Sequence, residues 1–190
     1  MNKQNKLINP NWAKHGYIQV YTGNGKGKTT ASLGLAMRAL GRSWKVLIVM
    51  FTKGGDDYGE LNSFRNLSEE IAKNLTIVQA GLDRIVYRNN KNEGDTKEIQ
   101  KGWKLAKHAI QNDEYNLIIL DEANVAIDLG LIDIEDMLNT LQNKPDDMEI
   151  VLTGRNAHPK IIEVAHLVSE IIPVKHYWDK GITARKGIEY

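Results

Sequence analysis

The sequence predicts an α/β domain in which a mostly parallel six-stranded sheet carries helices on both faces. Three observations predict this fold class. Short apolar runs alternate with longer segments of helical pattern, which is typical of strands joined by crossover helices. The central runs, such as Val46–Phe51, are apolar at consecutive positions, as in strands buried on both sides of a parallel sheet. A glycine-rich motif links the first run to the first helical segment.

The expected elements follow one another in alternating order along the chain. Strands are expected at Tyr17–Tyr21, Val46–Phe51, Leu75–Gln79, Leu117–Leu120, Glu149–Leu152 and Val168–Ile172. Helices are expected between them at Thr29–Leu40, Asp57–Lys73, Thr96–Asn112, Ile134–Gln142 and Pro159–Ala165. Gly41 suits a cap after the first helix, and Pro145 interrupts the chain before the fifth strand. The ends, 1–16 and 173–190, match no sheet element. We therefore expect one domain at 17–190 and a separate N-terminal segment at 1–16.

The composition fits one globular domain and excludes several classes of protein. The 190 residues are 42% hydrophobic and 26% charged, which are ordinary values. The 25 Lys and Arg against 24 Asp and Glu leave a net charge of +1, so we expect no nucleic-acid partner. The absence of cysteine excludes disulfides, iron–sulfur clusters and thiolate chemistry. The polar first residues and the short apolar runs predict no secretory signal, no membrane partner and a cytoplasmic location.

The glycine-rich motif predicts a nucleotide-binding site. Gly23, Gly27, Lys28 and Thr29 match the P-loop pattern G-x-x-x-x-G-K-[ST], between an expected strand and an expected helix. Glycines let backbone N–H groups approach phosphate oxygens, the helix N-terminus favours an anion, and lysine adds a positive charge. The alternative, a glycine-rich turn, is expected by chance on the order of 0.01 times in such a chain. The candidate nucleotide-binding residues are Gly23, Asn24, Gly25, Lys26, Gly27, Lys28, Thr29 and Thr30.

Acidic residues after a central strand predict a metal site. Asp121 and Glu122 directly follow the apolar run Leu117–Leu120. In P-loop proteins such a strand brings an acid close to Mg²⁺, and the P-loop hydroxyl, here Thr29, is the usual partner ligand. Two acids at an ordinary loop start are the alternative. The sequence leaves open which of the two carboxylates would bind Mg²⁺ (or Mn²⁺).

Arg155 is a third candidate, because it follows the fifth expected strand in the run Leu152–Arg155. Ligands collect at the carboxyl ends of strands in an open parallel sheet, so Arg155 would reach a triphosphate. An ordinary surface arginine is the alternative.

Several runs together resemble one family, the ATP:corrinoid adenosyltransferases. They are Tyr21–Thr30, Leu120–Glu122, Thr153–His158, Pro173–His176 and Gly187–Tyr190. The similarity extends from about Gly16 to the C-terminus. The P-loop is shared by many families, whereas its combination with the C-terminal block is diagnostic.

The resemblance implies a RecA-like P-loop fold, a homodimer, and a transferase reaction between ATP and a reduced corrinoid, cobalamin or cobinamide. The Co(I) ion of the corrinoid would attack the 5′ carbon of ATP and expel the whole triphosphate. Lys28 and Arg155 would then be catalytic through charge stabilisation, and His176 would contact the nucleotide. Because the chain has no cysteine and no flavin motif, an external reductase would supply the electrons.

The sequence departs from the family where aromatic residues are associated with the corrin face. Many relatives have a Phe-Thr-Trp run there, and this chain has Ile85, Val86 and Tyr87. These three are candidate corrinoid contacts, with core packing as the alternative for Ile85 and Val86. Trp12 is a further candidate, because the segment 1–16 would cover the active site of a neighbouring subunit. A flexible leader is the alternative for that segment.

Two other functions are compatible with a P-loop. One is a small-molecule kinase or ATPase, which would need an acceptor-activating base and usually an arginine-rich lid. The only arginines in residues 81–104 are Arg84 and Arg88, so this segment is not an arginine-rich lid. The other is a nucleotide-binding module without catalysis. The preferred corrinoid, the reductase, and the choice between synthesis and salvage stay open.

Overall fold

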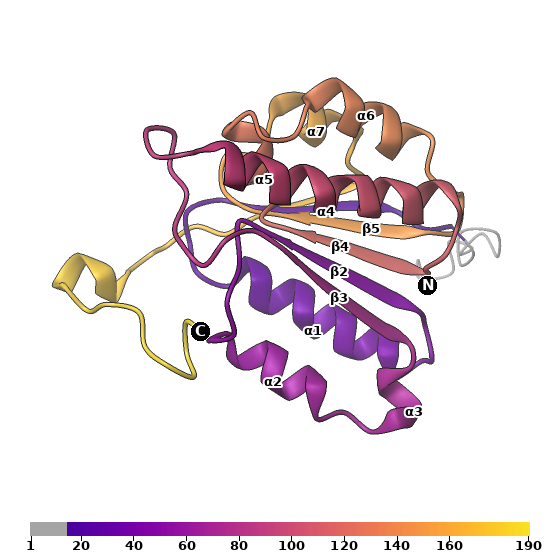
Figure 1. The fold of residues 1–190 in the computed structure, drawn as a ribbon, viewed down its shortest axis with the longest axis horizontal. Helices are drawn as coiled ribbons and strands as arrows, with labels where there is room; N and C mark the ends of the chain where they lie inside the picture. The colour runs from indigo at the N-terminus through magenta and orange to yellow at the C-terminus, as the bar shows by residue number, and fades with distance from the viewer. Residues whose placement is uncertain (1–14) are drawn as a thin grey trace, which may run out of the picture.

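The computed structural model describes residues 15–190 and contains one sheet with helices on both faces (Figure 1). The strands are β1 (Ile18–Thr22), β2 (Val46–Phe51), β3 (Leu75–Ala80), β4 (Leu117–Asp121), β5 (Glu149–Thr153) and β6 (Leu167–Glu170). The helices are α1 (Lys28–Leu40), α2 (Gly59–Arg65), α3 (Glu69–Ala72), α4 (Glu93–Gln111), α5 (Ala123–Asp128), α6 (Ile134–Gln142), α7 (Pro159–Val164) and the 3₁₀ helix η2 (Tyr177–Lys180).

The sheet is six-stranded, in the order β3-β2-β4-β5-β1-β6, and each neighbouring pair is parallel. The predicted α/β class with helices on both faces is therefore confirmed. β5 lies between β1 and β4, so the strand before the glycine-rich loop and the strand before the two acids are not neighbours. Because all strands run the same way, their carboxyl ends meet at one edge of the sheet.

Two hydrophobic clusters cover the two faces. Helices α1, α2 and α3 pack on one face and α4 to α7 on the other (Figure 1). Strand β2 contributes alternate residues to both clusters, and its six residues are all buried. Burial on both sides explains why its sequence is apolar at every position.

Two expected elements differ from the observed ones, and one observed α-helix was not expected. The helix expected over Asp57–Lys73 is divided into α2 and α3, because the chain leaves the helical conformation at Asn66 and Ser68, the residue before α3, has a ψ of 148°. The last strand ends at Glu170 rather than Ile172, where its pairing with β1 also ends. Helix α5 was not expected, and its six residues are too few for a periodic pattern to be recognised.

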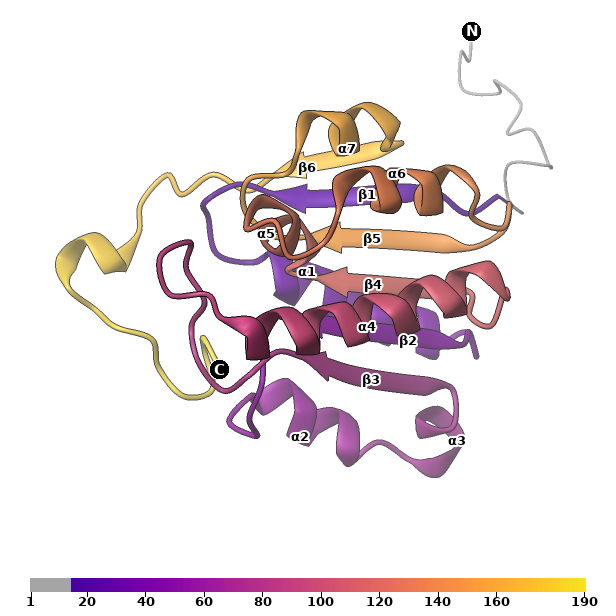
Figure 2. The same ribbon diagram turned by 45° about the horizontal axis from the view of Figure 1, so that its top comes forward.

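The segment after β6 crosses the carboxyl edge of the sheet (Figure 2). It runs past the loop between β1 and α1 and ends beside α2, where Tyr190 lies 3.8 Å from the position that a Cβ on Gly59 would take. No helix within residues 15–190 combines the length and the apolar character needed to cross a bilayer.

Gly102 allows α4 to approach the sheet closely. A Cβ at this position would lie 2.2 Å from the Cβ of Ala80 at the end of β3. We expect Gly102→Ala to lower the free energy of unfolding by about 1–3 kcal/mol, because the clash outweighs the better helix propensity of alanine. Urea unfolding followed by circular dichroism measures this change.

Gly34 is the matched control, because it also lies in a helix but nothing is within 4 Å of its added Cβ. Gly34→Ala should raise the free energy of unfolding by about 0.5–1 kcal/mol. Equal effects of the two substitutions would contradict the close packing of α4.

Candidate functional site

The loop between β1 and α1 has a backbone that only glycine adopts easily. Gly23 and Gly27 have φ values of 93° and 124°. A Cβ on Gly25 would lie 2.7 Å from the carbonyl oxygen of Ile171, which accepts a hydrogen bond of 2.7 Å from the Gly25 amide. The glycines are thus required by backbone conformation at two positions and by the close passage of the chain after β6 at a third.

Lys28, the first residue of α1, folds back across this loop. Its ammonium donates hydrogen bonds to the carbonyl oxygens of Gly23 (2.7 Å) and Gly25 (2.8 Å). Burial lowers the pKa of Lys28, and Arg155 also lowers it, against the opposing effects of Glu122 and Asp121. The lysine expected to bind phosphate is therefore held inside the loop, with its charge next to the cavity described below.

Asp121, at the end of β4, is the centre of a polar cluster. Its side chain is fully buried, and Oδ1 accepts hydrogen bonds from the hydroxyls of Thr29 (2.9 Å) and Thr153 (2.6 Å). Oδ2 accepts a bond of 2.7 Å from the ammonium of Lys53, which lies 3.3 Å from Thr29 Oγ1. The structure thus brings together the predicted residues Thr29 and Asp121 and adds two donors.

Lys53 was missed by the sequence interpretation. Burial lowers its pKa, but the charge of Asp121 and the hydrogen bond to it outweigh burial, and the pKa of Lys53 is raised overall. The only pointer to it in the sequence is its position two residues after the apolar run Val46–Phe51, and the pairing of the strands is needed to place it beside the acids. Lys53 follows a strand that runs parallel to β4, with Met50 paired to Asp121, so it emerges at the edge where the two acids lie.

Glu122 has a left-handed backbone, with φ of 58°, where it caps the start of α5. Its amide donates to Thr153 Oγ1 (3.0 Å), and its side chain lines the cavity. Burial raises the pKa of Glu122, and the nearby charge of Asp121 raises it further, while Lys53, Lys28 and Arg155 act in the opposite direction. Backbone strain of this kind is found most often at functional sites.

A cavity of about 720 Å³ lies above this cluster at the carboxyl edge of the sheet. Its floor is the glycine-rich loop, and its far wall is the C-terminal segment. It is lined by Asn24, Gly25, Lys26, Gly27, Lys28, Thr29, Thr30, Lys53, Glu60, Glu122, Arg155, His176, Tyr177, Trp178, Glu189 and Tyr190, among others. The predicted nucleotide-binding residues therefore gather around one cavity, except Gly23, which is not in its lining.

The C-terminal segment is tied to the glycine-rich loop. The Lys26 ammonium donates to the carbonyl oxygen of Ile188 (2.8 Å) and lies 4.0 Å from the Glu189 carboxylate. Glu189 also accepts hydrogen bonds from the Tyr177 hydroxyl and from the Arg185 amide. These contacts, with the Tyr177 bond as the largest cause, lower the pKa of Glu189 to about 2. The charged carboxylate thus organises the cavity wall.

His176 lines the same cavity, and its ring also has a structural contact. Nδ1 accepts a hydrogen bond of 3.1 Å from the Trp178 amide and so caps η2. Tyr177, Glu189 and Glu60 also line the cavity and were not predicted as site residues.

The loop between β3 and α4 carries the three residues expected near the corrin. Ile85 and Tyr87 are exposed, with 70% and 57% of their surface accessible, whereas Val86 is buried in the core at 8%. The burial of Val86 favours core packing for that residue, whereas the exposure of Ile85 excludes core packing for it. None of the three lines the cavity, although the loop starts at the same edge of the sheet. Trp12 lies outside the described residues.

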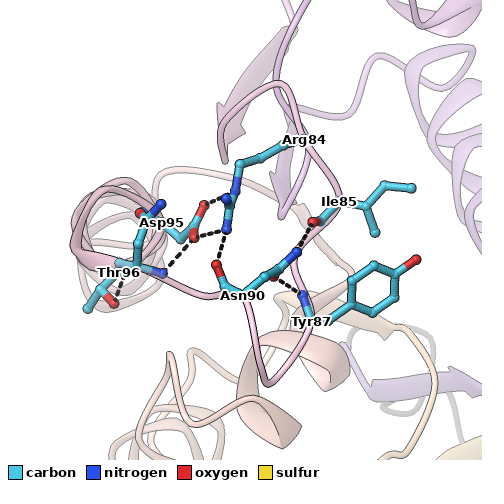
Figure 3. A network of polar contacts seen from close by, with 7 residues as sticks. Arg84, Ile85, Tyr87, Asn90, Asp95 and Thr96 are labelled. Atoms are coloured by element: carbon cyan, nitrogen blue, oxygen red, sulfur yellow. Dashed lines mark hydrogen bonds and ion pairs between the residues drawn. The ribbon is translucent and has the colours of Figure 1, made fainter.

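Polar contacts hold this loop in place (Figure 3). The Arg84 guanidinium binds both oxygens of the buried Asp95 carboxylate, at 3.1 and 2.7 Å, and donates to the Asn90 carbonyl oxygen. The Asn90 side chain in turn bridges the Ile85 carbonyl and the Tyr87 amide. The exposed side chains of Ile85 and Tyr87 therefore stand on a braced turn.

Comparison with known proteins extends over nearly the whole chain. The family model described as "ATP:corrinoid adenosyltransferase BtuR/CobO/CobP" matches residues 14–190. A corrinoid adenosyltransferase of Escherichia coli K12 is 36% identical over 177 residues, which is 93% of this chain and 87% of that protein. Corrinoid adenosyltransferase CobA of Salmonella typhimurium is 34% identical, with the same coverage. An uncharacterised Nostoc protein is 38% identical over 180 residues, and the chain spans about half of its length, 48%.

The raised pKa of Glu122 makes a signed prediction about pH. The pKa of Glu122 in the folded protein lies above its unfolded value of about 4.3. Below about pH 4.3 the side chain is protonated in both states and does not lower the free energy of unfolding. As the pH rises from there through the folded pKa, ionisation of the buried carboxyl lowers the free energy of unfolding. We expect Glu122→Gln to unfold at a higher temperature than the parent protein at about pH 7.5, with the two midpoints converging near about pH 4.

Differential scanning calorimetry at both pH values measures the difference. Glu163→Gln, at an exposed position on α7, is the matched control and should follow the parent protein at both. A Glu122→Gln variant that is less stable than the parent at neutral pH would show that the charge of Glu122 supports the fold.

Proposed function

The chain belongs to the ATP:corrinoid adenosyltransferase family, and we propose that it transfers the 5′-deoxyadenosyl group of ATP to the Co(I) of a corrinoid, releasing triphosphate. One observation carries the proposal. In a chain that matches the family over residues 14–190, Lys28 and Thr29 of the P-loop line a cavity that is also lined by the C-terminal block, and Thr29 is hydrogen-bonded to the buried Asp121. Cobalamin and cobinamide both fit this proposal.

The triphosphate would lie along the glycine-rich loop. The helix N-terminus of α1 and the cations Lys26, Lys28 and Arg155 line that part of the cavity. Lys28 would exchange its bonds to the loop carbonyls for phosphate oxygens, and Arg155 would approach from the end of β5. These groups stabilise the charge that develops on the leaving triphosphate, which is the catalytic role we assign to Lys28 and Arg155. His176, on the opposite wall, would contact the rest of the nucleotide.

The hard-oxygen donors at the base of the cavity fit Mg²⁺ (or Mn²⁺). Thr29 and Glu122 line the cavity and supply a hydroxyl and a carboxylate, and the second carboxylate is that of the buried Asp121, which is hydrogen-bonded to Thr29. Within residues 15–190, no group of three or more His, Cys, Asp or Glu side chains could hold a metal ion. Phosphate oxygens and water would therefore complete the coordination, as is usual for Mg²⁺. When bound, the ion would neutralise part of the triphosphate charge.

The reaction needs positioning more than acid–base chemistry. In the proposed step the electron pair of Co(I) forms a bond to the 5′ carbon, while the bond from that carbon to the triphosphate oxygen breaks and its electron pair leaves with the triphosphate. No water is activated and no proton is moved. The protein's residues therefore hold the two reactants in line and exclude water.

The corrinoid would approach from the open side of the cavity, next to the loop between β3 and α4. Ile85 and Tyr87 present apolar surface there, and their braced turn limits the entropy lost on binding.

The segment 1–16, with Trp12, is proposed to cover the site of a neighbouring subunit in a homodimer. An external reductase is proposed to produce Co(I), since the sequence has no cysteine. A cytoplasmic location stays a prediction.

Turnover tests the proposed function directly. We expect the protein, incubated anaerobically with Mg·ATP and chemically reduced corrinoid, to change the visible spectrum and to release one triphosphate per adenosylated product. Lys28→Ala should lower kcat/KM for ATP by at least about 100-fold, because it removes a charge that stabilises the leaving group. Lys45→Ala, at an exposed position before β2, is the control.

Other products would contradict the proposal. Release of orthophosphate, or transfer of the γ-phosphate, would indicate an ATPase or a kinase. ATP binding without any product would indicate a nucleotide-binding module.

The exposed pair on the β3–α4 loop gives a separate prediction. We expect the double variant Ile85→Ser, Tyr87→Ser to raise KM for the reduced corrinoid by about 10-fold or more and to leave KM for ATP unchanged, since two apolar side chains no longer lose water on binding. Trp44→Ser is the control, because Trp44 is 42% exposed and precedes β2 at the opposite edge of the sheet. Equal corrinoid KM values for the double variant and the parent protein would remove this loop from the site.

A further inference from the structure

We propose that Lys53 and a divalent cation alternate at one position, and that Lys53 becomes a ligand of the triphosphate when the cation replaces it. The inference rests on the proposed function for the identity of the nucleotide, but not on the corrinoid. It makes Lys53 a further catalytic residue, in contact with the leaving group.

The position is defined by two oxygens. The Lys53 ammonium lies 2.7 Å from Asp121 Oδ2 and 3.3 Å from Thr29 Oγ1. These are the hydroxyl and one of the two carboxylates that the sequence pattern predicts as candidate metal ligands. Asp121 Oδ1 already accepts two hydroxyl hydrogen bonds, so Oδ2 is the oxygen that a cation would take. The ammonium therefore holds the place of the expected metal ion.

Two cations cannot share this carboxylate oxygen. A divalent ion in contact with Oδ2 would lie within a few ångströms of the ammonium, in a region where the Asp121 side chain has no exposure and that of Lys53 has only 16%. Repulsion between like charges is strong where water is scarce. Binding of a divalent cation to Asp121 therefore requires Lys53 to leave.

The surroundings of Lys53 allow it to move and favour the cavity as its destination. The residue lies between Thr52, with a left-handed φ of 57°, and Gly54, and it has a flexible four-carbon side chain. It lines the cavity together with Glu60 and Glu122, and the Tyr58 ring is 5.7 Å from the ammonium. A triphosphate in the cavity brings several negative charges to the same space, so the displaced ammonium gains a stronger partner than either glutamate.

The first test measures Mg²⁺ binding without nucleotide, by calorimetry and by thermal unfolding. Lys53→Met removes the competing cation. We expect its metal-free form to unfold at a lower temperature than the parent, because the buried carboxylate loses its partner. We also expect Mg²⁺ to bind the variant at least about 10-fold more tightly and to restore its midpoint. Lys45→Met, at an exposed position, is the matched control.

The second test uses Mg·tripolyphosphate as the ligand, so it does not depend on corrinoid chemistry. Lys53→Met should bind it about 10- to 100-fold more weakly than the parent protein, as expected for the loss of a charged hydrogen bond. Failure of adenosyl transfer in the parent protein would contradict the proposed function and leave these two binding results unaffected.

Two results would overturn the inference. If Lys53→Met binds Mg²⁺ no more tightly than the parent, Lys53 does not compete with a metal ion. If its affinity for Mg·tripolyphosphate is unchanged, Lys53 is only a structural partner of Asp121.

Should Lys53→Met fail to fold, Lys53→Arg provides the same test with the opposite sign. A guanidinium can bind a carboxylate through two parallel hydrogen bonds and is harder to displace. Mg²⁺ affinity should then fall below that of the parent protein. An affinity equal to or above it would count against the exchange.

Discussion

The buried carboxylate of Asp121 is the constraint on which the arrangement of the site depends. A charge without solvent exposure is stable only when it is paired and hydrogen-bonded. Its partners come from three parts of the chain: Thr29 from α1, Lys53 from the segment after β2, and Thr153 from the end of β5. Since β4 lies between β2 and β5 in the sheet, both neighbouring strands deliver a donor to it. The fold and the site are therefore stabilised by the same contacts.

The C-terminal segment converts this open sheet edge into a cavity. Its first residues pass over the glycine-rich loop, where the Ile171 carbonyl oxygen accepts a hydrogen bond from the Gly25 amide. Its last residues return to the same loop, where the Ile188 carbonyl oxygen accepts a hydrogen bond from Lys26. Within the segment, the Glu189 carboxylate joins Tyr177 and Arg185. The wall is thus held at both ends, which suits a reaction in which positioning and exclusion of water do most of the work.

Features that depend on local sequence were predictable, and those that depend on tertiary contacts were not. The strands were found because burial on both faces gives consecutive apolar residues, and the P-loop because its glycines are fixed by one turn of backbone. Lys53 was not found, because its role appears only when β2 is known to lie next to β4. Likewise, the sequence could not separate buried Val86 from exposed Ile85, since the direction of each side chain depends on the turn that Arg84 and Asn90 hold.

A crystal structure with Mg·ATP tests the central claim most directly, since the account depends on where the triphosphate binds. The account predicts the triphosphate along Gly23–Thr30, with the Lys28 ammonium on its oxygens and the 5′ carbon of the ribose facing the open side of the cavity. A nucleotide bound elsewhere on the sheet, or a triphosphate in the loop with the ribose buried away from the cavity opening, would contradict it.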